Sequence, residues 1–414
     1  MDALFAGTAP DGGLYMPERL LPLPPDVVDR LRDADIVEIG TVVGAHLLRG
    51  EITREALRPL VADALDFPIP LVPVTDRIWA LELFHGPTLA FKDVGARMQA
   101  RLLHHFTDGT PLTILVATSG DTGSAVARAF YRVPDSRVFV LYPEGKVSDV
   151  QEAQMAGLGD NVTAVAVQGT FDDCQRLVKQ AFADDELRKH VWLTPANSIN
   201  LGRLLPQVFY YFLLARLVRA GMGPIVSVPS GNFGNLTAGL MARRIGLPVR
   251  RFVAATTVND AVPVYLRTGR YEPRPSVRTV ANAMDVGAPS NFERMQAMYG
   301  GDVDALRRDV VGYSYDDARV VAAIGDVYRR HGYLLDPHSA IGWLALADAL
   351  TEAEPDAVGV FLATAHPAKF REVVEPAIGR EVPLPKALAD ALARPRQAIR
   401  MPAEYEALER ILRA

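Results

Sequence analysis

Lys92 is the residue of this 414-residue chain that best suits the chemistry of a nucleophilic amine. Only six of the 44 basic residues are lysines. Because the chain uses arginine for most of its positive charges, a lysine is more often present for the chemistry of its amine. Lys92 follows Leu89, Ala90 and Phe91 and precedes a helical pattern. Apolar neighbours and the positive end of a helix both favour the neutral amine, which is the form that attacks a carbonyl to make an imine. The alternative is a solvent-exposed lysine in the first turn of an amphipathic helix.

Two loops rich in glycine and polar side chains follow expected buried strands. The first, SGNFGN, comprises residues 230–235, and the second, TSGDTGS, comprises residues 118–124. Backbone N–H groups at such glycines, together with the helix start that follows, favour an anion such as phosphate. Neither loop matches a Walker A or a G-x-G-x-x-G pattern. A tight turn or an N-cap is the alternative interpretation of each loop.

A further group of polar residues suits the anionic part of a small substrate. YPEGKVS contains Lys146, and NSINLGR contains four more candidates: Asn197, Ser198, Asn200 and Arg203. Cations and amides together can hold a phosphate. Turn and cap chemistry with a surface arginine is the alternative, and the residues alone favour it.

The segment FLATAHPAKF carries one more candidate. Thr364 ends an expected buried strand, where its hydroxyl could meet a ring nitrogen or could cap the chain. His366 and Lys369 fit ordinary loop residues.

The elements that would position these residues alternate between strand and helix. Continuous apolar strands followed by helices predict parallel sheets covered on both faces. We therefore expect an α/β fold with two open parallel-sheet domains and a cleft between them, plus a helical N-terminal part. The expected boundaries are 1–75 for the helical part, 76–205 for a smaller domain with Lys92 and the SGDTG loop, and 206–414 for a larger domain with the SGNFGN loop and Thr364.

Composition excludes several classes of protein. A formal net charge of −5 without a dense basic run argues against nucleic-acid binding. Neither a basic amphipathic stretch nor a long apolar span indicates a membrane. The single cysteine, Cys174, permits no intrachain disulfide and no cysteine metal site, and with a start unlike a secretory signal it indicates the cytoplasm.

Several segments occur together in an order that resembles one family. They are ELFHGPTLAFKD, ATSGDTGSAVARAF, YPEGKVS, NSINLGRLLPQ, SVPSGNFGNLTAGL, NAMDVGAPSNFERM and ATAHPAKF. The chain resembles the threonine synthase family of the long-chain bacterial and fungal type, from about residue 5 to near its C-terminus. Members use pyridoxal 5′-phosphate and have a tryptophan-synthase-β-like fold. Ala363 stands where members often have glycine.

The resemblance implies a role for each candidate residue. Lys92 would bind the cofactor as a Schiff base, with Phe91 and Asp121 close to the ring and Thr364 on the pyridine nitrogen. The residues that would hold the cofactor phosphate are Gly231, Asn232, Phe233, Gly234 and Asn235. The residues that would bind the phosphate and carboxylate of the substrate are Ser119, Thr122, Lys146, Asn197, Ser198, Asn200 and Arg203.

The implied reaction converts O-phospho-L-homoserine and water into L-threonine and phosphate, in a monomer or a homodimer. It needs places for two phosphates, which the two loops with Lys146 and Arg203 would supply without an overall basic protein. A pyridoxal-phosphate-dependent dehydratase or another β-eliminating lyase is the alternative within the cofactor class, and it needs only one such place. The alternatives outside that class are a nucleotide-dependent oxidoreductase and a non-catalytic amino-acid-binding module.

Overall fold

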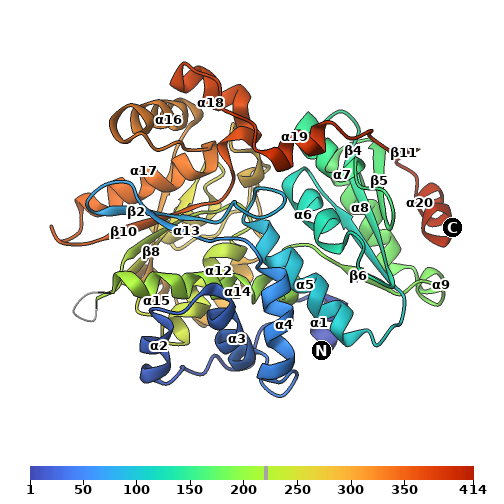
Figure 1. Ribbon diagram of the computed structural model, residues 1–414, viewed down its shortest axis with the longest axis horizontal. Helices are drawn as coiled ribbons and strands as arrows, with labels where there is room; N and C mark the ends of the chain where they lie inside the picture. Colours follow the sequence, from blue (N-terminus) through green and yellow to red (C-terminus); the bar gives the residue numbers. More distant parts are fainter. Residues whose placement is uncertain (219–221) are drawn as a thin grey trace. The chain divides into compact units, whose positions relative to one another are not determined.

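The computed structural model describes residues 1–218 and 222–414, and the chain forms two compact units. The smaller unit comprises Met1–Tyr15, Lys92–Arg203 and Leu384–Ala414, and the larger unit comprises Met16–Phe91 and Leu204–Pro383. Each unit contains one largely parallel sheet with helices, as the sequence predicted (Figure 1). Within the described ranges, no helix has both the length and the apolar character that crossing a membrane requires.

The larger unit is built on a six-stranded sheet in the order β1-β2-β10-β7-β8-β9. Every neighbouring pair is parallel except β1 with β2. β7 and β10 are buried along their whole length, which explains why their sequences are almost continuously apolar. The strands are β1 (Leu71–Pro73), β2 (Ile78–Glu82), β7 (Ile225–Pro229), β8 (Arg251–Thr256), β9 (Val310–Ser314) and β10 (Gly359–Ala363).

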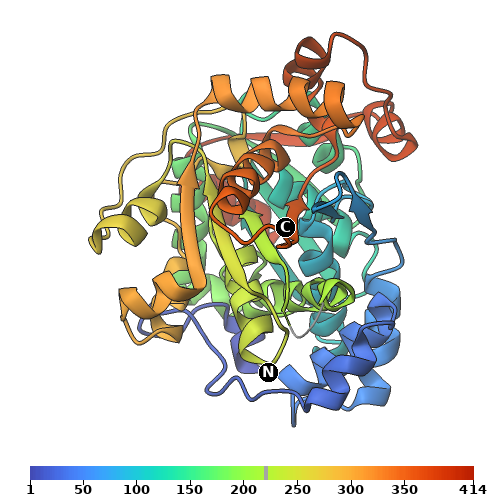
Figure 2. The same ribbon diagram turned by 90° about the vertical axis from the view of Figure 1, so that its left-hand side faces the viewer.

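The helices of the larger unit include the expected N-terminal ones, drawn in blue in Figure 2. Among them, α3 packs against α4 and also against α11. The segment 1–75 is not helical throughout, because its Pro-rich end forms β1 at the edge of the sheet, where prolines are tolerated. The bounds are α2 (Pro25–Leu31), α3 (Ile36–Leu47), α4 (Arg54–Ala64), α11 (Gln207–Tyr211), η1 (Phe212–Leu217), α12 (Gly234–Arg244), α13 (Ala261–Thr268), η2 (Asn282–Met284), α14 (Phe292–Met298), α15 (Val303–Asp309), α16 (Asp317–His331), α17 (Pro337–Thr351), η3 (Pro367–Phe370) and α18 (Arg371–Ile378).

Helices cover both faces of the larger sheet. α17 lies against Phe361 of β10, and α12 lies against Phe252 of β8. Phe361 pairs with Ser227 and Phe252 pairs with Val226, which are successive residues of β7. Because successive side chains of a strand point to opposite faces, α17 and α12 lie on opposite sides of the sheet.

The smaller unit is built on a five-stranded parallel sheet in the order β11-β5-β4-β3-β6. Its strands are β3 (Leu112–Ala117), β4 (Ser136–Pro143), β5 (Val162–Gln168), β6 (Leu193–Pro195) and β11 (Ala398–Pro402). Its helices are α1 (Asp2–Ala6), α5 (Lys92–Phe106), α6 (Asp121–Phe130), α7 (Asp149–Ala156), α8 (Phe171–Ala183), α9 (Asp185–Arg188), α10 (Leu201–Leu204, which ends in the larger unit), α19 (Lys386–Leu392) and α20 (Tyr405–Arg413).

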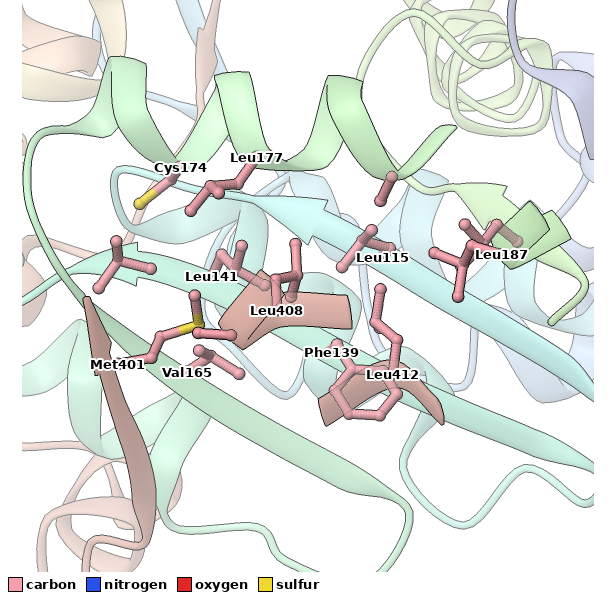
Figure 3. Close-up of a cluster of buried hydrophobic side chains, with 14 of the residues drawn as sticks. Leu115, Phe139, Leu141, Val165, Cys174, Leu177, Leu187, Met401, Leu408 and Leu412 are labelled. Atoms are coloured by element: carbon pink, nitrogen blue, oxygen red, sulfur yellow. The ribbon is translucent and has the colours of Figure 1, made fainter. Parts of the chain in front are cut away.

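A cluster of buried apolar side chains holds α8 and α20 on one face of this sheet (Figure 3). Leu115, Leu141 and Val165 extend from the strands, Leu177 from α8 and Leu408 from α20. Cys174 lies in the same cluster, and burial raises the pKa of its thiol to about 12. The cysteine is therefore a packed apolar side chain rather than a reactive thiol.

The end of the chain lies outside the unit in which the sequence placed it. Residues 384–414 belong to the smaller unit, because β11 pairs with β5 and α20 packs on α8. Residues 76–91 belong to the larger unit, because β2 pairs with β10. The sequence does not indicate that residues 384–414 belong to the smaller unit. β11 is an edge strand with the mixed sequence AIRMP, and most of its residues are exposed.

We expect Leu408→Ala to lower the free energy of unfolding of the smaller unit by about 2–5 kcal/mol, because it opens a cavity where a fully buried side chain holds α20 to the sheet. Urea unfolding of the full chain measures the effect. Glu406→Ala, at an exposed position of the same helix, is the control and should change the value by less than about 0.5 kcal/mol. An equal, small effect of both variants would show that α20 does not stabilise the unit.

Candidate active site

The larger unit gathers three predicted segments at one edge of its sheet. β2, β10 and β7 are parallel neighbours, so the residues that follow them lie at the same carboxyl edge. These residues are the segment 83–91 that leads to Lys92, then Thr364, and the loop 230–233. Ligands of open α/β sheets bind at this edge.

The loop after β7 is closely packed against another part of the same unit. A Cβ atom at Gly231 would lie 2.8 Å from the carbonyl oxygen of Ala283, so only glycine fits there. Phe233 adopts a left-handed conformation with a φ of 61° at the N-cap of α12, and its side chain is buried. This conformation costs energy for a residue with a side chain, and such strain is found at ligand-binding sites.

Asn232 is fixed by the NAMDVGAPSNFERM segment, residues 282–295. Its Oδ1 accepts a hydrogen bond from the N–H of Ser290 over 2.7 Å, and its carbonyl accepts one from the N–H of Asn291 over 3.3 Å. The Oδ1 of Asn291 accepts from the guanidinium of Arg294 over 2.6 Å, and burial lowers the pKa of that arginine to about 10. The side-chain oxygen of Asn232 therefore shapes the loop instead of facing a ligand.

The start of α12 presents hydrogen-bond donors. The first backbone bond of the helix runs from the N–H of Thr237 to the carbonyl of Phe233 over 2.9 Å, so the N–H groups of residues 234–236 precede the helical ladder. The Nδ2 of Asn235 is buried and has no hydrogen-bond partner among the described residues. Backbone donors, the positive end of a helix and a buried amide donor together suit a phosphate group.

The residue before Lys92 is bound to the strand end that carries Thr364. The N–H of Phe91 donates to the carbonyl of Thr364 over 2.8 Å. The N–H of Thr364 donates to the Oγ of Ser339 over 3.3 Å, and Ser339 donates to the buried carboxylate of Asp336. Lys92 directly follows Phe91, and neighbouring Cα atoms are about 3.8 Å apart. The hydrogen bond to Thr364 therefore fixes the backbone immediately before Lys92.

Backbone hydrogen bonds also hold the chain that approaches Phe91. The N–H of Leu83 donates to the carbonyl of Ala363 over 2.9 Å, and the N–H of His366 donates to the carbonyl of Leu89 over 3.0 Å. Leu89 is buried with a φ of 58°, a conformation that leucine rarely adopts. The surrounding contacts fix the path of the chain into Lys92.

Lys369 is not the ordinary loop residue that the sequence indicated. Its side chain is only 3% exposed, and its Nζ donates to the carbonyl of Thr88 over 2.9 Å. The ammonium group therefore anchors the turn that precedes Lys92. Its neighbour His366 caps η3 through Nδ1, and burial lowers the pKa of that imidazole.

Lys92 is half-buried and is the first residue of α5 in the smaller unit, as the helical pattern predicted. Asp93 follows it and is fully buried. Gly95 lies so close to Arg203 that a Cβ atom there would be 2.6 Å from the arginine's carbonyl oxygen. Burial lowers the pKa of Arg203 to about 10, and nearby Asp93 opposes this shift. A buried acidic and a buried basic side chain therefore adjoin the first turn of α5.

The smaller unit gathers its own predicted segments at the carboxyl edge of its sheet. β4, β3 and β6 are parallel neighbours. They are followed by the end of YPEGKVS, by the TSGDTGS loop and by the start of NSINLGR. The polar residues predicted to bind a substrate anion thus follow three adjacent strands.

The TSGDTGS loop is organised by Thr118 and Gln151. The hydroxyl of Thr118 accepts from the N–H groups of Gly120 and Gly123, over 3.0 and 2.9 Å, so the threonine caps α6 in place of Ser119 or Asp121. The Nε2 of Gln151 donates to the Oδ1 of Asp121 over 3.1 Å. Gln151 is also the N3 residue of the capping box that begins α7, so it links the two loops.

The seven predicted substrate residues differ in how available their side chains are. Asn200 is fully buried, and its Nδ2 donates to the carbonyls of Leu4 and Pro195 over 2.7 and 3.0 Å. Arg203 is 4% exposed and donates to the carbonyl of Ala196 over 2.6 Å. The remaining five are at least partly exposed: Ser119, Thr122, Lys146, Asn197 and Ser198.

The sequence analysis did not identify the residues that hold the predicted site residues in place. Gln151 and Ser339 contact Asp121 and Thr364, which are remote in the sequence, and Asp336 acts through Ser339. Local spacing does not show the two remote partners. Two signals were available: Asp336-Pro337 is a typical helix start, and the Ser148–Gln151 spacing is that of a capping box.

Comparison with known proteins decides the family. The model for pyridoxal-phosphate dependent enzymes matches residues 67–365, and the models for the threonine synthase N terminus and the threonine synthase C-terminal part match 1–65 and 339–412. The threonine synthase of Serratia marcescens is 44% identical over 99% of this chain and 95% of its own length. The chain belongs to the threonine synthase family.

Solved structures of this family have the same fold. The crystal structure of threonine synthase from Escherichia coli matches with a TM-score of 0.92 and 43% identity, over 99% of this chain and 95% of that one. The pyridoxal-phosphate-bound threonine synthase of Brucella melitensis matches with a TM-score of 0.94 and 38% identity, over 100% of this chain and 95% of that one. The cofactor of the family is therefore pyridoxal 5′-phosphate.

The residues of the larger unit fit this cofactor. The donors at the start of α12 match the charge of its phosphate, and the loop SGNFGN contains no acidic side chain that would repel it. The hydroxyl-bearing Thr364 lies at the end of the neighbouring strand β10, as a partner for a ring nitrogen requires.

We expect Ser339→Ala to lower the free energy of unfolding by about 1–3 kcal/mol, because it leaves the buried N–H of Thr364 without its acceptor. Chemical unfolding of the cofactor-free chain measures this loss. The matched control is Ser276→Ala, at an exposed position of the same unit, which should have almost no effect. If both variants unfold like the unaltered chain, the hydrogen bond does not stabilise this strand end.

Proposed function

We propose that this enzyme converts O-phospho-L-homoserine and water into L-threonine and phosphate. The observation that carries the proposal is the presence of two separate donor sets, one at the carboxyl edge of each sheet. The glycine loop and the start of α12 form one set, and the loops after β4, β3 and β6 form the other. A reaction with a phosphorylated cofactor and a phosphorylated substrate requires two such sets, and full-length similarity to threonine synthases supports the assignment.

Lys92 would hold the cofactor covalently between turnovers. The bound cofactor supplies an electron sink for the substrate carbons next to the amino group. Once the amino group of the substrate has displaced it, the neutral Nζ of Lys92 would accept protons from the α- and β-carbons. The hydrogen bond from Phe91 to Thr364 supports this role, because it fixes the backbone from which Lys92 projects.

The atoms of the reaction balance without an added oxidant or reductant. The bond between the γ-carbon and the phosphate oxygen breaks, and phosphate leaves with the bonding electrons. The oxygen of water then bonds to the β-carbon, and the departed phosphate would accept the proton of this water. Lys92 would return protons to the γ- and α-carbons, which completes the methyl group and the amino acid.

The cofactor would be held mainly by groups of the larger unit. Residues 231–235 would bind its phosphate through backbone N–H groups and the amide of Asn235. The hydroxyl of Thr364 would bind the ring nitrogen, and a neutral partner of this kind leaves that nitrogen largely unprotonated. Phe91 and Asp121 would lie close to the ring, with the carboxylate of Asp121 oriented by Gln151.

The substrate anions would be bound by the polar residues of the smaller unit that are at least partly exposed. These groups are Ser119, Thr122, Lys146, Asn197 and Ser198. We assign positioning roles to Asn200 and Arg203, because their buried side chains donate to backbone carbonyls of the same unit. We further propose that the enzyme acts in the cytoplasm, which the single buried thiol supports, and that it is a monomer or a homodimer.

The decisive test incubates the purified protein with pyridoxal 5′-phosphate and O-phospho-L-homoserine and measures threonine and phosphate together. We expect equal amounts of both products. A parallel incubation with serine or threonine tests for dehydratase activity. Release of ammonia and a 2-oxo acid there, without phosphate release from the phosphorylated substrate, would overturn the proposal in favour of a β-eliminating lyase.

Lys92→Ala should abolish turnover and the visible absorption of lysine-bound cofactor, because no other group replaces its amine. Borohydride reduction followed by mass spectrometry should place the cofactor mass on the peptide that contains residue 92. Lys179→Ala, at an exposed position of the same unit, is the control and should retain both properties. Covalent cofactor attachment that persists in Lys92→Ala would disprove the assignment.

A further inference from the structure

We propose that Tyr210 and Tyr211 are positioning residues that orient the amide of Asn235 so that its Nδ2 faces the cofactor phosphate. The inference rests on the proposed function, which assigns that phosphate to residues 231–235. It adds two tyrosines of α11 that belong to no glycine loop and that carry no motif of their own.

Both hydroxyl groups meet the same oxygen atom. The hydroxyl of Tyr210 lies 2.6 Å from the Oδ1 of Asn235, and that of Tyr211 lies 2.7 Å from it. The hydroxyl of Tyr211 also lies 2.9 Å from the backbone carbonyl of Asn235, which can only accept. Asn235 is the second residue of α12, so this contact reaches the first turn of the helix.

The distances distinguish the two ends of the amide. Separations of 2.6 and 2.7 Å are typical of O–H···O bonds, whereas N–H···O bonds are centred near about 2.9–3.0 Å. The oxygen of the Asn235 amide therefore faces the tyrosines, and its nitrogen points away from them. That nitrogen is the buried donor that has no partner among residues 1–218 and 222–414.

The tyrosine rings have little freedom to move. Both are fully buried, and their ring centres lie 5.1 Å apart. Tyr211 also makes an edge contact with Phe252 at 6.0 Å. A Cβ atom at position 239 of α12 would lie 2.8 Å from the Cζ of Tyr211, so the ring occupies space that only Gly239 leaves open.

Burial also keeps both phenols in their donor form. It raises the pKa of Tyr210 and of Tyr211 well above the ordinary value of 10. The two hydroxyl groups therefore stay protonated, with one proton each to donate. Tyr210 lies 2.6 Å from the Oδ1 of Asn235 and 3.4 Å from the Oε1 of Gln207, so its proton goes to Asn235. Tyr211 shares its proton between the Oδ1 and the backbone carbonyl of Asn235.

The orientation matters because the two ends of an amide interact oppositely with an anion. The nitrogen donates a charge-assisted hydrogen bond to phosphate, whereas the oxygen would repel it. Without the phenols, the amide loses the donors that distinguish its two ends. The cofactor phosphate would then have to hold the amide alone, which costs binding free energy.

The test compares two ligands of the full chain freed of cofactor: pyridoxal 5′-phosphate, and pyridoxal, which lacks the phosphate. The variant is the double substitution Tyr210→Phe and Tyr211→Phe, which removes two oxygen atoms and keeps both rings. We expect the affinity for pyridoxal 5′-phosphate to fall about tenfold and the affinity for pyridoxal to change less than about twofold. Absorbance titration measures both.

Asn235→Ala separates this inference from the proposed function. It should reduce the preference for the phosphorylated ligand, and adding the tyrosine substitutions to it should reduce the preference no further. If Asn235→Ala leaves the preference unchanged, the phosphate assignment of the proposed function fails. If Asn235→Ala reduces the preference and the double tyrosine variant does not, only the present inference is overturned.

A merely structural role of the tyrosines has its own signature. In that case the double variant would bind both ligands more weakly by the same factor, and this would overturn the inference. Tyr299→Phe is the control, because it removes a partly buried tyrosine hydroxyl of the same unit that donates to Asp309 instead of to Asn235. It should leave the preference unchanged. If the double variant does not fold, each single variant should still show a reduced preference, and an unchanged preference in both would overturn the inference.

Discussion

The hydrogen bond from the N–H of Phe91 to the carbonyl of Thr364 is the contact on which the architecture of the site depends. It joins the residue before Lys92 to the end of β10, the strand beside the glycine loop. Both atoms belong to the backbone, so the contact does not depend on side-chain rotamers. Thr364 is held from its other side by Ser339, which makes this strand end a fixed reference point.

Neutral donors would do most of the anion binding in the proposed site. The larger unit offers backbone N–H groups and an amide at the start of α12, and the smaller unit offers hydroxyls and amides with one exposed cation, Lys146, among its predicted substrate residues. Helix starts supply positive potential without a formal charge. A protein with a net charge of −5 can therefore be built to bind two phosphates.

Local pattern placed the candidate residues, and the resemblance to a family supplied their chemistry, but neither predicted the residues that support them. Lys92 at a helix start, and two glycine loops after strands, follow from residue type and spacing. Lys369 is buried because its partner, the carbonyl of Thr88, comes from a distant part of the chain. Tyr210 lies in the apolar stretch QVFYYFLLARLV, and nothing in the sequence shows that its hydroxyl meets Asn235. Contacts between segments remote in sequence are what pattern alone cannot supply.

The smaller unit is assembled from three separate segments of the chain, and this has a consequence for its biosynthesis. Its sheet is completed by β11, which pairs with β5. Residues 204–383 of the larger unit are translated between these two strands. The nascent chain must therefore carry β5 with an unpaired, apolar edge until the last strand leaves the ribosome. An unpaired strand edge favours intermolecular pairing, so aggregation of the growing polypeptide is most favoured before β11 is made.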